Sequence, residues 1–103
     1  MRRVVLLEEA VLEAEEAASW YEAQREGLGS EFREAFGRSL DVLREGLVTG
    51  TLWPSPLGER GIRRIQMRRF PYHVVFVVRE PGVIVLAVAH QRRRPGYWRN
   101  RTK

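Results

Sequence analysis

The sequence predicts an α+β domain in which two antiparallel helices pack on an antiparallel sheet of three or four strands. Apolar residues recur at steps of three and four in the N-terminal half, which is typical of helices. In the C-terminal half they alternate with polar residues or form short continuous runs, which is typical of strands. The 103 residues suffice for one modest core, so we expect a single domain over residues 1–103.

The first helix is predicted from a stripe of small residues. A short apolar run at residues 4–7 precedes it and is expected to form an edge strand. Residues at steps of four, three and four then share one helical face: Ala10, Ala14, Ala17 and Tyr21. Glutamates fill the other faces, and Gly27 is a suitable C-terminal cap.

The second helix is expected to begin after Ser30, a residue type that caps helix N-termini well. Its apolar stripe consists of Phe32, Phe36, Leu40, Leu43 and Leu47. With only a short glycine-containing link between them, the two helices should form an antiparallel hairpin.

Residues 46–61 contain two prolines and four glycines, which argues against any long element there. Leu52, Trp53 and Leu57 are expected to hold this connection against the core.

Three strands are predicted beyond the connection. Ile65 and Met67 alternate with polar residues, which gives one buried and one basic face, and Phe70-Pro71 allows a turn or bulge. Tyr72–Arg79 and residues 83–90 are apolar on both faces, so they should be central strands joined by a turn at residues 80–82. Their second face then needs cover, which the connection or the C-terminal tail could provide.

Charge is distributed unequally along the chain. Residues 1–59 hold six arginines against twelve acids, whereas residues 60–103 hold eleven arginines and one lysine against Glu80 alone. The net charge of +5 therefore combines an acidic half with a strongly basic half, which indicates a polyanion or an acidic protein as partner.

Several classes of function are excluded or disfavoured. The absence of cysteine excludes disulfides, thiolate catalysis and cysteine zinc sites. The two histidines have no nearby ligand set for a metal, no phosphate-cradling glycine loop is present, and no cofactor is expected. No apolar run is long enough to span a bilayer and the N-terminus does not resemble a signal peptide, so we expect a cytoplasmic protein without membrane contact.

The candidate site residues lie on the last strands and in the tail. In the tail, arginines that suit phosphate contacts surround Tyr97 and Trp98, which either stack on a ligand or close the core. His73 and His90 are the side chains that titrate near neutrality; each is either structural or a general acid or base beside arginines.

The chain resembles the RelE/ParE superfamily of bacterial toxins over about residues 4–101. The resemblance rests on Trp20-Tyr21-Glu22, Gly27-Leu28-Gly29, Phe32, Pro54, Arg64, Phe70-Pro71-Tyr72, His90, Arg92-Arg93, Pro95 and Tyr97-Trp98. It implies two N-terminal helices against a curved antiparallel sheet. It also implies a toxin encoded beside a cognate antitoxin whose acidic segment covers the basic surface, with a homodimer or a toxin–antitoxin hetero-oligomer as possible assemblies.

The resemblance implies two alternative mechanisms. ParE-like members bind and inhibit DNA gyrase, and the FPY segment and the tail favour this subgroup. Residues for target or antitoxin binding would then be Arg68, Arg69, His90, Arg94, Trp98, Arg99 and Arg101. RelE-like members cut messenger RNA on the ribosome, and catalytic roles would fall to Arg64, His73, Arg92, Arg93 and Tyr97. The ribonuclease alternative weakens if His73 faces the helices.

Overall fold

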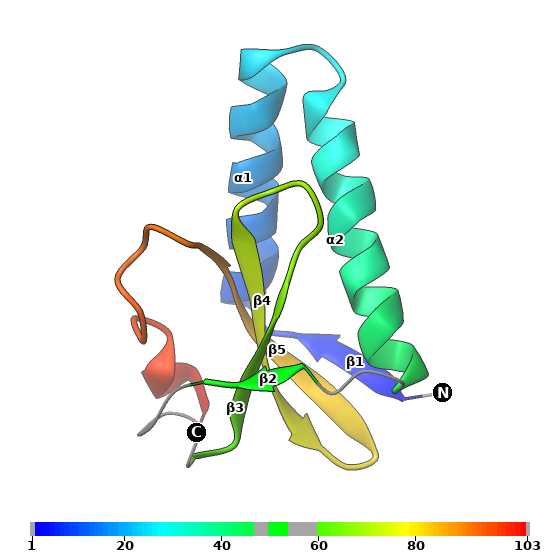
Figure 1. The fold of residues 1–103 in the computed structure, drawn as a ribbon, viewed down its shortest axis with the longest axis vertical. Helices are drawn as coiled ribbons and strands as arrows, with labels where there is room; N and C mark the ends of the chain where they lie inside the picture. Colours follow the sequence, from blue (N-terminus) through cyan, green and yellow to red (C-terminus); the bar gives the residue numbers. More distant parts are fainter. Residues whose placement is uncertain (1, 47–49, 54–59, 103) are drawn as a thin grey trace.

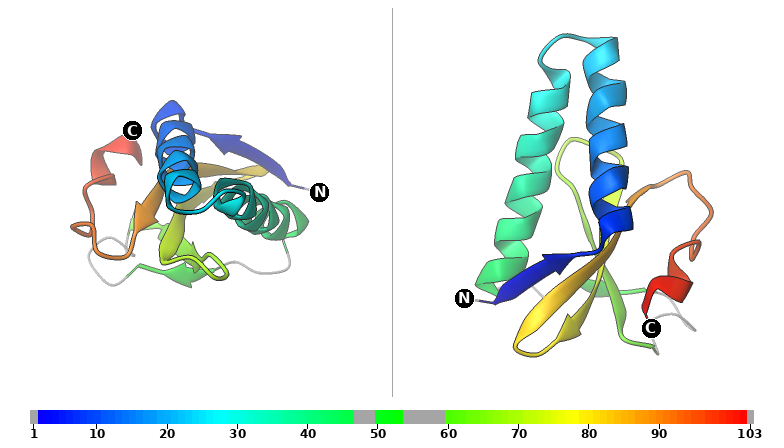
Figure 2. Two further views of the ribbon diagram at one scale, coloured as in Figure 1. Left: turned by 90° about the horizontal axis from the view of Figure 1, so that it is seen from above. Right: turned by 180° about the vertical axis from the view of Figure 1, so that it is seen from behind.

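The computed structural model describes residues 2–46, 50–53 and 60–102. It confirms the α+β class: a helix hairpin packs on one face of a curved sheet (Figure 1). The elements are β1 (Arg3–Leu6), α1 (Glu8–Gln24), α2 (Leu28–Glu45), β2 (Thr51–Leu52), β3 (Ile62–Gln66), β4 (Tyr72–Arg79), β5 (Gly82–His90) and the 3₁₀ helix η2 (Arg99–Thr102). Figure 2 shows α1 and α2 side by side, and the chain after β5 looping away from the helices before it forms η2.

The sheet has the strand order β1-β5-β4-β3-β2, so β4 and β5 are interior strands, as predicted. It contains five strands instead of the three or four expected from the sequence. The edge strand β1 pairs with β5 in parallel, while the other pairs are antiparallel. The additional strand β2 has two residues, too few to leave a period in the sequence, and it forms because Thr51 and Leu52 lie against Arg64 and Arg63.

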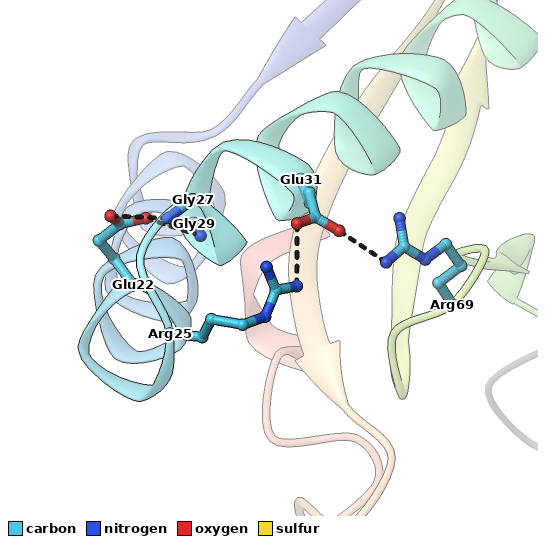
Figure 3. A network of polar contacts seen from close by, with 6 residues as sticks. All are labelled: Glu22, Arg25, Gly27, Gly29, Glu31 and Arg69. Atoms are coloured by element: carbon cyan, nitrogen blue, oxygen red, sulfur yellow. Dashed lines mark hydrogen bonds and ion pairs between the residues drawn. The ribbon is translucent and has the colours of Figure 1, made fainter.

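The helix boundaries differ from those predicted, because a side chain from the last turn of α1 caps α2. Gly27, expected to end the first helix, precedes α2 in the left-handed conformation at φ 89°, and Ser30 lies inside α2. The backbone N–H groups of Gly27 and Gly29 donate to the Glu22 carboxylate at 3.0 and 2.9 Å (Figure 3). These two bonds lower the pKa of Glu22, since they favour the ionised carboxylate. Glu22 thus replaces the local cap that the sequence suggested.

A second carboxylate joins α2 to the turn between β3 and β4. Glu31 accepts hydrogen bonds from Arg25 at 2.9 Å and from Arg69 at 2.7 Å (Figure 3). These guanidinium contacts hold the pKa of Glu31 below its ordinary value. Arg69 itself lies at φ 71°, a conformation that non-glycine residues adopt rarely.

Both faces of the sheet are covered. On the helix side, Phe32 and Phe76 are fully buried in a core with the alanines of α1. On the opposite side, Val75 and Val77 pack with the fully buried Trp98 of the tail and with Trp53 of the connection, as predicted. Leu52 does not contribute as predicted, because it points outward with 46% of its surface exposed. Leu47, Pro54 and Leu57 lie outside the described residues.

The close approach of the two helices can be tested at Gly29. A Cβ atom there would lie 2.7 Å from the carbonyl oxygen of Ala18, so we expect Gly29→Ala to lower the free energy of unfolding by about 1–3 kcal/mol. Gly37→Ala, with nothing within 4 Å of its added Cβ in the same helix, should raise it by about 0.5–1 kcal/mol. Urea denaturation of both variants measures the difference. Equal stability of the two variants would contradict this account of the hairpin.

Candidate functional site: a basic pocket beneath the C-terminal tail

A small pocket lies on the sheet face turned away from the helices. It has a volume of about 60 Å³, and residues of β3, β4, the end of β5 and the tail line it. We call it the basic pocket, because its charged lining among the described residues is Arg64, Arg93 and Arg94, with no carboxylate. His73, His90 and Gln91 complete its polar lining, and Trp53, Tyr97 and Trp98 are its aromatic walls.

Strand register places Arg64 and His73 in the pocket. His73 shares a face of β4 with Val75 and Val77, which belong to the core beneath the tail, so it faces away from the helices. The guanidinium of Arg64 stacks on the ring of Trp53 with 4.5 Å from Cζ to the centroid. The His73 ring meets the same indole edge to face at 6.1 Å. Trp53 therefore fixes both polar groups at one wall of the pocket.

Backbone hydrogen bonds shape the opposite wall, formed by residues 90–95. The N–H of Arg92 donates to His90 Nδ1 at 3.0 Å, and the N–H of Arg93 donates to the His90 carbonyl at 2.9 Å. Gln91 bonds through its N–H to the Pro71 carbonyl and through its side chain to Gln66. This turn directs Arg93 across the ring of Tyr97, with 4.1 Å from Cζ to the centroid.

Two residues of the pocket lining carry buried polar atoms without partners in the described part of the chain. Nδ1 of His73 and Nε1 of Trp98 are buried, and neither has a hydrogen-bond partner in the part of the chain that the structure describes. Burial and the charge of Arg64 both lower the pKa of His73, so its imidazole is neutral at pH 7. The charged side chains of the described lining are therefore arginines, although Arg93 also lines a neighbouring pocket that contains Glu13 and Glu16.

Glu13 of α1 holds the tail in place, and the sequence analysis missed it. Its carboxylate accepts hydrogen bonds from the Tyr97 hydroxyl at 2.7 Å, from Arg101 at 3.1 Å and from the Val88 N–H at 3.0 Å. The side chains of Glu13 and Arg101 are only 15% and 19% exposed. One signal could have revealed Glu13, since it follows Ala10 by three residues and precedes Ala17 by four, on the buried stripe.

The same ion pair completes an interrupted sheet edge. β1 pairs with β5 only as far as Val85, and a bulge at Leu86 follows. Beyond that point Arg101 donates to the Leu86 carbonyl at 2.9 Å, and the Glu13 carboxylate takes the N–H of Val88. Side chains from the two ends of the chain thus satisfy backbone groups that an edge strand would leave open.

The structure brings together four of the five residues considered for catalysis. Arg64, His73, Arg93 and Tyr97 line the pocket, while Arg92 is exposed outside its lining. The Tyr97 hydroxyl is bonded to Glu13, and burial together with that bond raises the pKa of Tyr97.

The residues considered for binding are dispersed. His90 and Arg94 line the pocket, whereas Arg68 lines a separate groove beside α2. Three arginines have partners within the chain: Arg69 pairs with Glu31, Arg101 with Glu13, and Arg99 donates to the Gly96 carbonyl. Trp98, expected at the binding surface, is fully buried because it closes the second core, so its indole is not presented to a partner.

Neither a metal centre nor a membrane span emerges from the described residues. No three acidic or histidine side chains among them gather closely enough to hold a metal ion. The helices in the described ranges are too short or too polar to cross a bilayer.

The contacts that Glu13 makes with Tyr97, Arg101 and Val88, which we call the Glu13 latch, predict a large loss of stability when its charge is removed. Glu13→Gln should lower the free energy of unfolding by about 2–4 kcal/mol, because Arg101 would keep its charge in a largely buried position. Glu15→Gln, in an ion pair with Arg33 that is more than half exposed, should cost less than about 0.5 kcal/mol. Chemical denaturation at pH 7 compares the two variants. Similar losses would show that Glu13 is not a structural latch.

The environment of His73 predicts its titration. In an NMR titration of the imidazole protons, the midpoint for His73 should lie below the ordinary value of 6.5. Arg64→Gln should raise that midpoint, since it removes a repelling charge, and Arg79→Gln at the far end of β4 should leave it unchanged. A midpoint that does not respond to Arg64→Gln would contradict the placement of this arginine beside His73.

Comparisons with known proteins identify the family. Residues 4–95 match the family model described as the ParE toxin of the type II toxin–antitoxin system parDE. Curated protein sequences give no significant match. Among solved structures, a chain of the chromosomal ParDE toxin–antitoxin system from P. aeruginosa shares the fold, with a TM-score of 0.67 and 14% identity. The match covers 87% of this chain and 96% of that one. The chain therefore belongs to the ParE toxin family of type II toxin–antitoxin systems.

Proposed function

We propose that this toxin acts by binding DNA gyrase, and that the acidic segment of its cognate antitoxin neutralises it by covering the basic surface. Membership in the ParE family supports a toxin with an antitoxin partner. The excess of arginines beyond residue 60 supports acidic partners, since exposed guanidiniums form strong paired contacts with carboxylates.

The state of Tyr97 is the observation that favours binding over RNA cleavage. In-line cleavage of RNA needs a general base, cations for the phosphate and an acid for the leaving group. The Tyr97 hydroxyl already donates its proton to Glu13 at 2.7 Å, and its raised pKa disfavours proton transfer. Cleavage needs a second acid or base beside His73, and the remaining candidate in the described lining is His90. Its Nδ1 already accepts a hydrogen bond from the Arg92 N–H.

Ribosome-dependent RNA cleavage is the second candidate, and one observation favours it. Arg64, His73 and Arg93 converge on one pocket away from the helices, where a neutral imidazole could act as a general base. With either target, the proposal includes neutralisation by the acidic segment of the antitoxin, and assembly as a homodimer or as a toxin–antitoxin hetero-oligomer.

A supercoiling assay tests the gyrase proposal. We expect the purified chain to inhibit ATP-dependent supercoiling of relaxed plasmid by gyrase. Arg92→Gln should weaken inhibition by about threefold to tenfold, since an exposed charge at an interface contributes about 1 kcal/mol. Arg79→Gln, which removes an exposed arginine from the opposite end of the sheet, should have no effect.

Mapping messenger RNA 5′ ends in a translating extract tests the alternative. No ribosome-dependent cuts are expected from a gyrase inhibitor. Cuts that require ribosomes and disappear in Arg92→Ala or Tyr97→Phe would overturn the gyrase proposal and make the chain a ribonuclease.

A further inference from the structure

The outer side of β1 is an open edge of the sheet. β1 is the terminal strand of the order β1-β5-β4-β3-β2, and Figure 2 shows it along the outside of the molecule. The Leu7 N–H donates to a carbonyl of β5 at 3.0 Å, whereas the Arg2 N–H points the other way and donates to the Arg44 carbonyl. Because backbone groups alternate in direction along a strand, those of Val4 and Leu6 face outward. In the described chain no turn, loop or side-chain hydrogen bond reaches them, so they are available to another strand.

Apolar surface adjoins this edge on the sheet face turned away from the helices. Val5 lies beside Ile84, which packs on the core beneath the tail, so the two share that face. The tail does not cover this end of the sheet, since Val5 keeps 45% of its surface exposed. A hollow of about 240 Å³ next to it is lined by Val5 and Ile84, with Arg3 and Arg79 as the charged residues of its described lining. An exposed apolar residue on an open edge strand indicates a partner.

The charges around β1 indicate what that partner is. Residues 2–9 read RRVVLLEE, with two basic residues before the apolar run and two acidic residues after it. Arg3, Glu8 and Glu9 are exposed and form no ion pair within the described residues. Two copies of this segment running antiparallel bring the basic end of each to the acidic end of the other, whereas a parallel arrangement sets like charges together. An acidic peptide would attract Arg3 but would be repelled by Glu8 and Glu9.

We propose that the edge of β1 is the interface at which two copies of this chain form a twofold-symmetric dimer with a continuous sheet. Val4 of one copy lies opposite Leu6 of the other, and the two exchange backbone hydrogen bonds. Val5 then meets Val5 of the second copy at the axis, at a position where side chains approach closely. Arg3 lies opposite the residue that precedes Glu8 of the second copy.

This contact is isologous and closed, so it yields a dimer and no longer assembly at this edge. It rests on the homodimer named with the proposed function, for which it specifies the surface, and it is independent of the target of the toxin.

Sedimentation equilibrium of the full, tag-free chain from about 1 to 500 µM tests the dimer. We expect a dissociation constant on the order of 10–100 µM, because four-residue strands make a small interface. Val5→Asp should weaken dimerisation at least about tenfold, since it sets two carboxylates together at the axis. Leu52→Asp is the matched control, because Leu52 is 46% exposed at the opposite edge of the same sheet. It should change the constant less than about twofold.

Charge inversion tests the antiparallel arrangement. Arg3→Glu and Glu8→Arg should each weaken dimerisation by about fivefold to thirtyfold, since the twofold axis repeats every contact. Both substitutions in one chain should restore the dissociation constant to within about threefold of its original value, because the two charges exchange places. Damage to β1 or α1 by either substitution would not be repaired in this way.

Amide hydrogen exchange followed by NMR tests which backbone groups form the interface. Exchange of the Val4 and Leu6 N–H groups should slow as the chain concentration passes the dissociation constant. The Val5 N–H, which faces β5, should be protected at every concentration.

Four results would overturn the proposal: a monomer at every concentration, equal effects of Val5→Asp and Leu52→Asp, no recovery in the doubly inverted chain, or exchange at Val4 and Leu6 that is independent of concentration. Protection of Val4 and Leu6 by an eight-residue peptide of alternating glutamate and valine, added to the monomer, would instead assign the edge to an acidic partner. Failure to inhibit gyrase would leave these measurements unchanged. A strictly monomeric chain that inhibits gyrase would overturn the interface alone.

Discussion

The central strands β4 and β5 are apolar on both faces, and this constraint determines how the rest of the molecule is arranged. Residues such as Phe76 and Val75 point to opposite sides of the sheet and are both fully buried. Two helices cover only one side. The second side is covered by Trp53 from the connection and Trp98 from the tail, which meet edge to face at 4.9 Å. The tail that carries the arginines is therefore bound to the core, and two of them, Arg93 and Arg94, line the pocket on that face.

The position of the tail depends in turn on one carboxylate. Glu13 accepts hydrogen bonds from three residues, two in the tail and one at the open edge of β5, and so joins the acidic N-terminal half to the basic C-terminal half. A charge with less than a fifth of its side chain exposed is tolerated only when it is fully paired, and Arg101 and Tyr97 provide that pairing. The contact that closes the fold thereby occupies the hydroxyl that a nuclease mechanism would need.

The resulting pocket combines fixed cations with a neutral imidazole. Stacking on Trp53 and Tyr97 restricts Arg64 and Arg93 before any ligand arrives, so less conformational entropy is lost on binding. Burial and the neighbouring guanidinium keep His73 uncharged, which avoids a further repelling charge in the lining. These features favour recognition of an anion over proton transfer.

The sequence by itself determined the α+β class, the helix hairpin, the interior position of β4 and β5 and the need for cover on their second face, because each depends on local periodicity. It also named Arg64, His73, Arg93 and Arg94 as candidates, through the charge of the tail and the resemblance to the toxin superfamily, and the structure places these four in the lining of one pocket. Only the tertiary structure decided the cap of α2, the two-residue strand β2, the parallel pairing of β1 and the roles of Glu13 and Trp98. Glu22 caps Gly27 and Gly29 across the hairpin loop, and Glu13 reaches Arg101 across 88 positions. The partner of Glu13 is set by how the elements pack, and the Glu22 cap depends on the path of the loop between the helices, so no periodic pattern records either one.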